Sequence, residues 1–215
     1  EVAAQNAIDQ GITVVAFDMD IPAEGIYKVT GDNESMGVAS ANYIVEKIGT
    51  TGTVVALPVP TSGSVSELRM KGFTDTMAEI APDVEIIEYA TAFTREDGLK
   101  DMADILTANP EIDAVYSLDD ETSIGALQAI EDAGRTDIKA ITGGGCQEYF
   151  NIIKEKADEI HACSALYSPL MIKDCLDVAL SVLGGETVDA VKVIPSQIVD
   201  ATNVDEYIDP SNTIY

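Results

Sequence analysis

The chain has no tryptophan, a single histidine and three cysteines. An odd number of cysteines cannot form a complete disulfide framework, although one pair among Cys146, Cys163 and Cys175 stays open. These cysteines lack the spacing of metal ligands, and His161 alone cannot complete a histidine-rich site. We therefore expect the cysteines to fill the core as small apolar residues, and we expect neither a metal nor a cofactor.

Positive charge is also scarce. Asp and Glu number 38 against 12 Lys and Arg, which gives a formal net charge of -26. Such a surface repels phosphate backbones and anionic membranes, so nucleic acid is excluded as a partner. No apolar run approaches the roughly 20 residues that a membrane-spanning helix needs. The chain starts at Glu1, without Met and inside a helical pattern, so we expect that an N-terminal segment has been removed or left out.

What is present is an alternation of strand and helix patterns in a globular composition, with 46% hydrophobic residues over 215 positions. Short β-branched runs predict strands at 12–17, 26–30, 53–57, 84–89, 114–118, 138–142, 160–166, 191–194 and 197–199. Helical spacing fills the segments between most of them. This alternation predicts an α/β fold, with a parallel sheet and helices on both of its faces.

The unit at 53–73 is the most informative of these. A β-branched strand ends at Pro58, a small-residue loop follows, and a helix starts near Ser64. Loops at the carboxyl ends of strands are where open α/β sheets bind ligands. Arg69 lies in the second turn of that helix, where its five N–H donors need acceptors. It is either a ligand residue or a paired surface arginine.

The segment 172–183 has the most regular helical pattern of the chain. Its apolar positions are Ile172, Cys175, Leu176, Ala179, Leu180 and Leu183. They share one face of a helix, and Gly184 and Gly185 end it. The pattern predicts an amphipathic helix.

Three enzymatic interpretations deserve comparison. Asp18 and Asp20 are spaced like the nucleophile and proton-transfer residues of haloacid-dehalogenase-type phosphatases, with Asp119–Asp120 as a magnesium site, but Ile21-Pro22 replaces the usual Gly-Thr. The Gly143–Gly145 run matches neither phosphate-binding pattern and indicates a tight turn. A Cys146–His161 nucleophilic pair requires a proximity that sequence does not show. The phosphatase remains the alternative from another class.

A carbohydrate cleft is the fourth interpretation. Asp18, Arg69, Phe93 and Asp119 all fall at predicted strand ends or at the helix starts beside them. Planar carboxylate and guanidinium groups pair with adjacent hydroxyls, and an aromatic face covers C–H surface. These residue types at one sheet edge favour a small polyhydroxylated ligand.

Several longer stretches resemble the ribose/galactose-type periplasmic sugar-binding proteins, which have the type I periplasmic-binding-protein fold. They are GITVVAFD at 11–18, GDNESMG at 31–37, ELRMKGF at 67–73, TANPEIDAVYSLDDETSIGALQAIEDAG at 107–134 and NVDEY at 203–207. The resemblance implies a non-enzymatic ABC-transporter solute-binding component that lacks most of its N-terminal lobe. It further implies a periplasmic or extracellular protein, or a cell-surface lipoprotein in a Gram-positive organism. LacI-type effector domains share the fold and remain an alternative.

The same resemblance divides the chain. It implies that residues 1–31 are a remnant of the first lobe and 32–167 the second lobe. Residues 168–199 return to the first lobe, and 200–215 form a C-terminal tail. Solute binds between the lobes, which close by hinge bending, and passes to an ABC permease or a chemoreceptor. Because the strands that flank 12–17 are missing, we expect the remnant of the first lobe to expose an edge and an apolar face, and hence self-association of the truncated chain.

The family's ligand residues carry over position by position. Asp18 matches the sugar-binding Asp, Arg69 the hydroxyl-binding Arg, and Phe93 the stacking aromatic. Four positions depart from the family pattern: Met19 stands where ribose binders have Arg, Asp119 where they have Asn, Tyr167 where they have Gln, and Gly144 where ribose and galactose binders have Asp. The departures predict a ligand with more donors or fewer ring hydroxyls, such as a polyol or an amino-bearing sugar.

Overall fold

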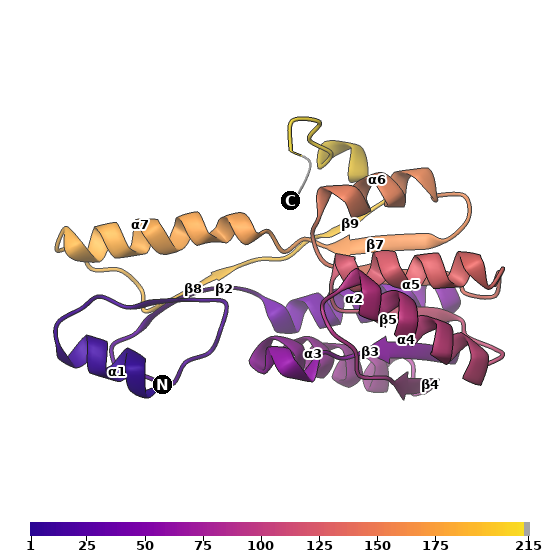
Figure 1. Cartoon of the computed structure of the whole chain (residues 1–215), viewed down its shortest axis with the longest axis horizontal. Helices are drawn as coiled ribbons and strands as arrows, with labels where there is room; N and C mark the ends of the chain where they lie inside the picture. The colour runs from indigo at the N-terminus through magenta and orange to yellow at the C-terminus, as the bar shows by residue number, and fades with distance from the viewer. Residues whose placement is uncertain (213–215) are drawn as a thin grey trace.

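The protein consists of a smaller and a larger part joined end to end (Figure 1). The computed structural model describes residues 1–212. The smaller part contains α1 (Val2–Asp9), β1 (Val15–Phe17), β2 (Tyr27–Gly31), the 3-10 turn η2 (Pro169–Met171), α7 (Ile172–Leu183) and β8 (Val191–Ile194). The larger part contains α2 (Asn33–Ile48), β3 (Thr51–Leu57), η1 (Pro60–Ser62), α3 (Ser64–Ile80), β4 (Asp83–Glu88), α4 (Arg95–Ala108), β5 (Ala114–Ser117), α5 (Asp120–Asp132), β6 (Ala140–Gly143), α6 (Gln147–Glu155), β7 (His161–Ala165), β9 (Ile198–Asp200) and η3 (Val204–Glu206).

The larger part is built on a six-stranded sheet with the order β4-β3-β5-β6-β7-β9. Side chains alternate along β3, so Val55 and Leu57 pack under α4 and α5 while Val54 and Ala56 pack under α2 and α3. A strand segment with both faces covered needs apolar residues at successive positions, which is why Val54 to Leu57 of β3 are all apolar and buried. The predicted α/β fold with helices on both sheet faces is confirmed.

The smaller part is a three-stranded parallel sheet with the order β1-β2-β8. Val29 on β2 is fully buried against Cys175 and Val178 of α7. The helix lies along one side of this sheet (Figure 1). The outer strands of this sheet, β1 and β8, each have one edge without a partner strand among residues 1–212.

The chain crosses between the two parts after β2, after β7 and after β8. The last crossing differs from the sequence expectation, which kept residues 168–199 together. Strand β9 instead pairs antiparallel with β7 in the larger sheet, with Ser164 opposite Val199. Pro195 follows β8, and a proline cannot supply the N–H that would extend the small sheet's ladder. The predicted division of the chain otherwise stays a prediction.

Helix α7 forms as expected, and most of its apolar face is exposed. Cys175 and Val178 contact the sheet, whereas Ile172, Leu176, Leu180 and Leu183 are exposed by 52%, 62%, 60% and 73%. These four exposed side chains, which we call the α7 stripe, recur at spacings of three and four residues on one side of the helix. The α7 stripe is thus an exposed apolar face on the smaller part, as expected.

Two further expectations concern single features. Cys146, Cys163 and Cys175 are all buried and unpaired, as expected for small core residues. Within residues 1–212, no helix combines the length and apolarity needed to cross a bilayer. Of the expected C-terminal tail, the structure describes residues 200–212, and Val204 at its start is buried in the larger core.

Candidate ligand-binding site

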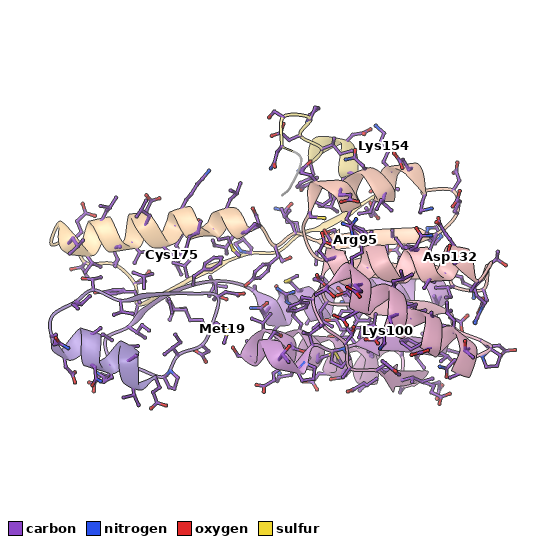
Figure 2. All side chains as sticks on the ribbon, in the orientation of Figure 1. Met19, Arg95, Lys100, Asp132, Lys154 and Cys175 are labelled. Atoms are coloured by element: carbon purple, nitrogen blue, oxygen red, sulfur yellow. The ribbon has the colours of Figure 1, made fainter. Side chains whose placement is uncertain are left out.

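A cavity of about 400 Å³ opens where the smaller part meets the larger one. Figure 2 labels Met19, which lies at this junction. All six residues proposed from the sequence line the cavity: Asp18, Arg69, Phe93, Asp119, Gly144 and Tyr167. Five of them follow the carboxyl ends of strands, with Tyr167 on the crossing after β7, and Arg69 lies in the second turn of α3. The structure thus brings them together, and their role in binding stays a prediction.

Asp18 has the most unusual backbone of these residues. Its φ of 67° lies in the left-handed region, and no other non-glycine residue among 1–212 has a positive φ. Its amide donates to Val29 O at 2.8 Å, which fixes the turn after β1. One carboxylate oxygen accepts from Thr30 Oγ1 and Asn33 Nδ2, both at 3.4 Å, and from the Tyr167 hydroxyl. Strained backbone held by several such partners is characteristic of functional sites.

Arg69 is 5% exposed and is held from three directions. Its Nε donates to Asn33 Oδ1 at 2.8 Å, and its Nη1 donates to the Leu118 carbonyl at 2.6 Å. The Tyr167 ring covers the guanidinium face at 4.5 Å. The alternative of a paired surface arginine is therefore wrong, since Arg69 makes no ion pair with a described residue and lines the cavity.

Asn33 and Tyr167 connect the two parts behind the cavity. The Tyr167 hydroxyl accepts from Gly31 N at 3.1 Å and from Asn33 Nδ2 at 3.2 Å, and it donates to Asp18. A Cβ on Gly31 would lie 2.0 Å from the Tyr167 ring, so that position requires glycine. Burial, and next the hydrogen bond to Asp18, raise the pKa of the Tyr167 hydroxyl, which therefore keeps its proton at neutral pH.

Asp119 and Asp120 follow β5 and have different environments. Asp119 caps α5 by accepting from Glu121 N at 3.2 Å and Thr122 N at 3.3 Å. Burial raises its pKa, and the opposing hydrogen bonds and Arg69 are weaker influences. Asp120 is 3% exposed, and burial raises its pKa to about 7. Both carboxyls line the cavity, and Asp120 is the more deeply buried of the two.

The glycine-rich loop 143–146 is held in place by Asp120 and Ser164. The Cys146 amide donates to Asp120, the Gly145 amide donates to Ser164 Oγ at 2.6 Å, and Ser164 Oγ donates to Asp120 at 3.2 Å. Gly145 has a φ of 99°, which favours glycine. The loop is thus a tight turn, as predicted, and it places Gly144 at the cavity wall.

Apolar groups complete the cavity. Phe17, Val65, Phe93 and Pro169 line it beside Met19, which is 45% exposed. Phe93 also packs on the core under α2 and α3, which fixes its ring. Apolar walls with a few charged groups suit a ligand that has both C–H surface and polar groups.

Two polar residues of the site were not predicted as such. Asn33 was not singled out from the sequence; Asp32 caps α2 by accepting from Ser35 N at 3.0 Å, and Asn33 is buried beside Arg69. Asp120 was considered only as a magnesium ligand. The buried Asn33 follows a strand end directly, and this position is the sequence signal that indicates it.

The arrangement does not fit a phosphatase. Asp20 is exposed and pairs with Lys28 at 3.2 Å. Among residues 1–212, no group of three or more His, Cys, Asp or Glu side chains is arranged to hold a metal ion. His161 is exposed on β7 while Cys146 is buried, and burial and then Asp120 raise the pKa of the Cys146 thiol to about 12, so this thiol is not an activated nucleophile.

Comparisons with known proteins point to one family. The family described as "Periplasmic binding protein domain" matches residues 1–187. A xylitol-binding protein of Mycolicibacterium smegmatis is 27% identical over 93% of this chain and 58% of its own length. The ribose import binding protein of Salmonella typhimurium is 28% identical over 87% of this chain and 63% of its own. The chain thus spans about three fifths of the length of these curated relatives.

Solved structures agree. An ABC transporter solute-binding protein from Mycobacterium smegmatis with bound glycerol superposes with a TM-score of 0.86, at 26% identity, over 100% of this chain and 74% of its own. One from Agrobacterium vitis with bound D-fucose superposes with a TM-score of 0.87 at 21% identity, over 100% of this chain and 74% of its own. The second likeness shows the fold alone.

Proposed function

The chain belongs to the periplasmic binding protein domain family, and from this premise we propose that it binds a small carbohydrate or polyol in the cavity between its two parts. The family consists of solute-binding proteins rather than enzymes, so the phosphatase alternative is set aside. A solute-binding protein has to bind its solute reversibly and needs no catalytic group. A cavity with groups that pair with hydroxyls and with apolar walls is suited to this task.

The observation that carries this proposal is the composition of the cavity wall. Asp18 and Met19 come from the smaller part, Arg69 and Asp119 come from the larger part, and Tyr167 lies on a crossing between them. A ligand that contacts both sides stabilises their closed arrangement through differential binding. The named relatives bind xylitol or serve ribose import, which supports a sugar or polyol here.

The proposal extends to the wider system. We take 1–31 and the segment from 168 through β8 as pieces of one lobe, and the sheet between them as the other lobe. The three crossings then form the hinge. The partner is an ABC permease, and the location is the periplasm or the cell exterior, because relatives are periplasmic binding proteins.

Thermal unfolding with a ligand panel tests the proposal. The panel contains xylitol, glycerol, ribose, allose, galactose and fucose. A ligand present at a hundredfold excess over its dissociation constant stabilises the native protein by about 2.7 kcal/mol, which is measurable as a rise in Tm. We expect at least one panel member to give such a rise, and titration calorimetry then to give a stoichiometry of one.

A cavity variant and a matched control separate specific binding from general stabilisation. Phe93→Ala removes an apolar wall of the cavity, whereas Phe150→Ala removes a buried ring of the larger core that does not line the cavity. Both variants lose stability, but only Phe93→Ala should lose affinity. Absence of any shift across the panel, or equal affinity loss in both variants, would refute the proposal.

A further inference from the structure

The cavity carries more negative charge than the described residues neutralise. Asp18, Asp119, Asp120 and Glu121 line it, whereas Arg69 is the one cationic side chain on its wall among residues 1–212. Glu121 is paired with Arg95 at 3.1 Å. Neither Asp18 nor Asp119 makes an ion pair with a described cation. Two cavity carboxylates therefore share one guanidinium that touches neither of them.

Arg69 is not free to move to either carboxylate. Its Nε and Nη1 are used by Asn33 Oδ1 and the Leu118 carbonyl, and the Tyr167 ring covers its face. Nη2 makes no hydrogen bond to residues 1–212, and it is not one of the fully buried atoms that lack a partner. It is therefore open to solvent, and a ligand that displaces this water has to offer Nη2 an oxygen in its place.

The carboxylate acceptors that line the cavity are also incompletely used. Asp18 accepts through Oδ1, while its Oδ2 has no partner among the described residues. The Tyr167 hydroxyl already supplies a neutral donor to Oδ1, as a sugar hydroxyl would. Each oxygen of Asp119 accepts one backbone N–H and keeps a second lone-pair site. The remaining need at these carboxylates is for positive charge.

Met19 does not offset the negative charge of the cavity carboxylates. It lines the cavity next to Asp18 at a position where a basic side chain would neutralise a carboxylate, and a thioether carries no charge. Burial raises the pKa of Asp119, and neither its hydrogen bonds nor the charge of Arg69 offsets this effect. Closing the cavity removes water and increases the cost of each uncompensated charge.

We propose that the ligand of this cavity carries a protonated amine on a small hydroxylated skeleton. The proposal rests on the function proposed above and narrows it. The ammonium donates to Asp18 Oδ2 and Asp119, a hydroxyl accepts from Arg69 Nη2, and Phe93, Val65 and Met19 cover the C–H surface. An ammonium supplies both the donors and the charge that the protein lacks, whereas a neutral hydroxyl supplies donors alone.

Matched pairs of ligands test this. The pairs are glucosamine with glucose, galactosamine with galactose, and 1-amino-1-deoxysorbitol with sorbitol, with N-acetylglucosamine as the uncharged amide. Titration calorimetry at pH 7 is performed on the purified protein in low and in moderate salt. We expect the amine of at least one pair to bind at least tenfold more tightly than its neutral partner, and N-acetylation to abolish that advantage.

Variants locate the effect. Asp119→Asn keeps an efficient helix cap, and Asp18→Asn keeps a residue type that tolerates the left-handed backbone, so both should fold. Each should bring the ratio of the two dissociation constants toward one. Asp32→Asn is the matched control, because it makes the same change at the cap of α2, outside the cavity lining, and should leave the ratio unchanged.

The outcomes separate this inference from the proposed function. If neutral members bind as tightly as the amines or more tightly, the charge argument is wrong and the carbohydrate function stands. If the amine advantage persists in both Asp18→Asn and Asp119→Asn, the assignment to these carboxylates is wrong. If neither member of any pair binds and the neutral panel also fails, both proposals are wrong.

Discussion

Arg69 shows how one residue gains a function from its surroundings. Two neutral acceptors and an aromatic face orient the guanidinium without using a carboxylate, which leaves its charge available to the cavity. Fixing a long side chain in advance removes the entropy cost that a flexible arginine would have on binding. The residue is thus pre-organised for a ligand oxygen.

Replacing Arg69 with alanine should weaken ligand binding by about 2 kcal/mol or more, because ligand oxygens lose a buried charged donor. Titration calorimetry with the tightest panel ligand measures the change. Arg135→Ala is the matched control: Arg135 pairs with Asp137 at 2.6 Å and donates to the Leu106 carbonyl, away from the cavity. It should lose stability and keep affinity. An unchanged dissociation constant for Arg69→Ala would exclude it as a ligand residue.

The sequence was sufficient to predict which residues lie together at the cavity, but not which buried residues hold them in position. Asp18, Arg69 and Asp119 follow strand ends, and strand ends of a parallel sheet meet at one edge, so their proximity was predictable. The burial of Asn33 and Asp120 was not, because it depends on which side chains pack over them. Single-sequence patterns carry no information on such pairings.

Asp120 should make folding stability depend on pH. Burial raises its pKa to about 7, whereas an unfolded aspartate has a value of about 4. Between these values the native state binds more protons than the unfolded state, so the free energy of unfolding decreases as pH rises. We expect a loss on the order of 1 to 3 kcal/mol from pH 5 to pH 8, measured by denaturant unfolding.

Two variants check that slope. Asp120→Asn should flatten it, because the amide stays neutral and still accepts from the Cys146 amide. Asp113→Asn should keep it. The hydrogen bonds of Asp113 from Lys139 and Thr53 lower its pKa despite the opposing effect of burial, so it titrates below this pH range. Parallel slopes for the native protein and Asp120→Asn would contradict the assignment.

At the scale of elements, glycines set the distance between paired helices. A Cβ on Gly72 of α3 would lie 2.0 Å from the Glu34 carbonyl of α2. In the pair α4 and α5, a Cβ on Gly125 would lie 2.1 Å from the Arg95 carbonyl. Both pairs therefore pack backbone to backbone. Through the first pair, Asn33 on α2 reaches Arg69 on α3.

Gly72→Ala should push α2 and α3 apart and destabilise the protein by about 1 to 3 kcal/mol. It should also weaken ligand binding, because Asn33 no longer orients Arg69. Gly125→Ala is the matched control, with a similar stability loss and a smaller effect on affinity. Thermal unfolding and calorimetry measure the two quantities. Equal affinity changes would show that helix spacing does not act through Arg69.

Helix α7 shows which property of an element its sequence determines. The spacing of apolar residues predicted its existence and extent, since a 3.6-residue period is a local property. It did not predict which side is covered. Cys175 and Val178 contact the small sheet, whereas the α7 stripe does not. Which side of a helix is buried depends on segments that are distant in the sequence.

For the whole molecule, the α7 stripe and the open edge of β1 predict self-association of the 215-residue chain. Unpaired strand edges and contiguous apolar surface both favour association. Analytical ultracentrifugation should show oligomers that increase with concentration. A Leu176→Glu, Leu180→Glu double variant should be monomeric, whereas Leu99→Glu, at a position on α4 that is 37% exposed, should not change the distribution. A monomeric native profile at high concentration would refute this.

The pairing of β2 with β8 sets the earliest moment during translation at which the small sheet can form. Lys28 lies opposite Val191, so the central strand of the small sheet acquires one of its two partners only after the whole of segment 32–190 has been synthesised. At roughly 5 to 20 residues per second, the ribosome takes on the order of 8 to 30 seconds to produce that partner. During this interval the larger sheet can complete most of its ladder while the first 31 residues have no complete sheet to join. The small sheet can thus be completed only after β8 has been synthesised, and the larger sheet only after β9, which follows it.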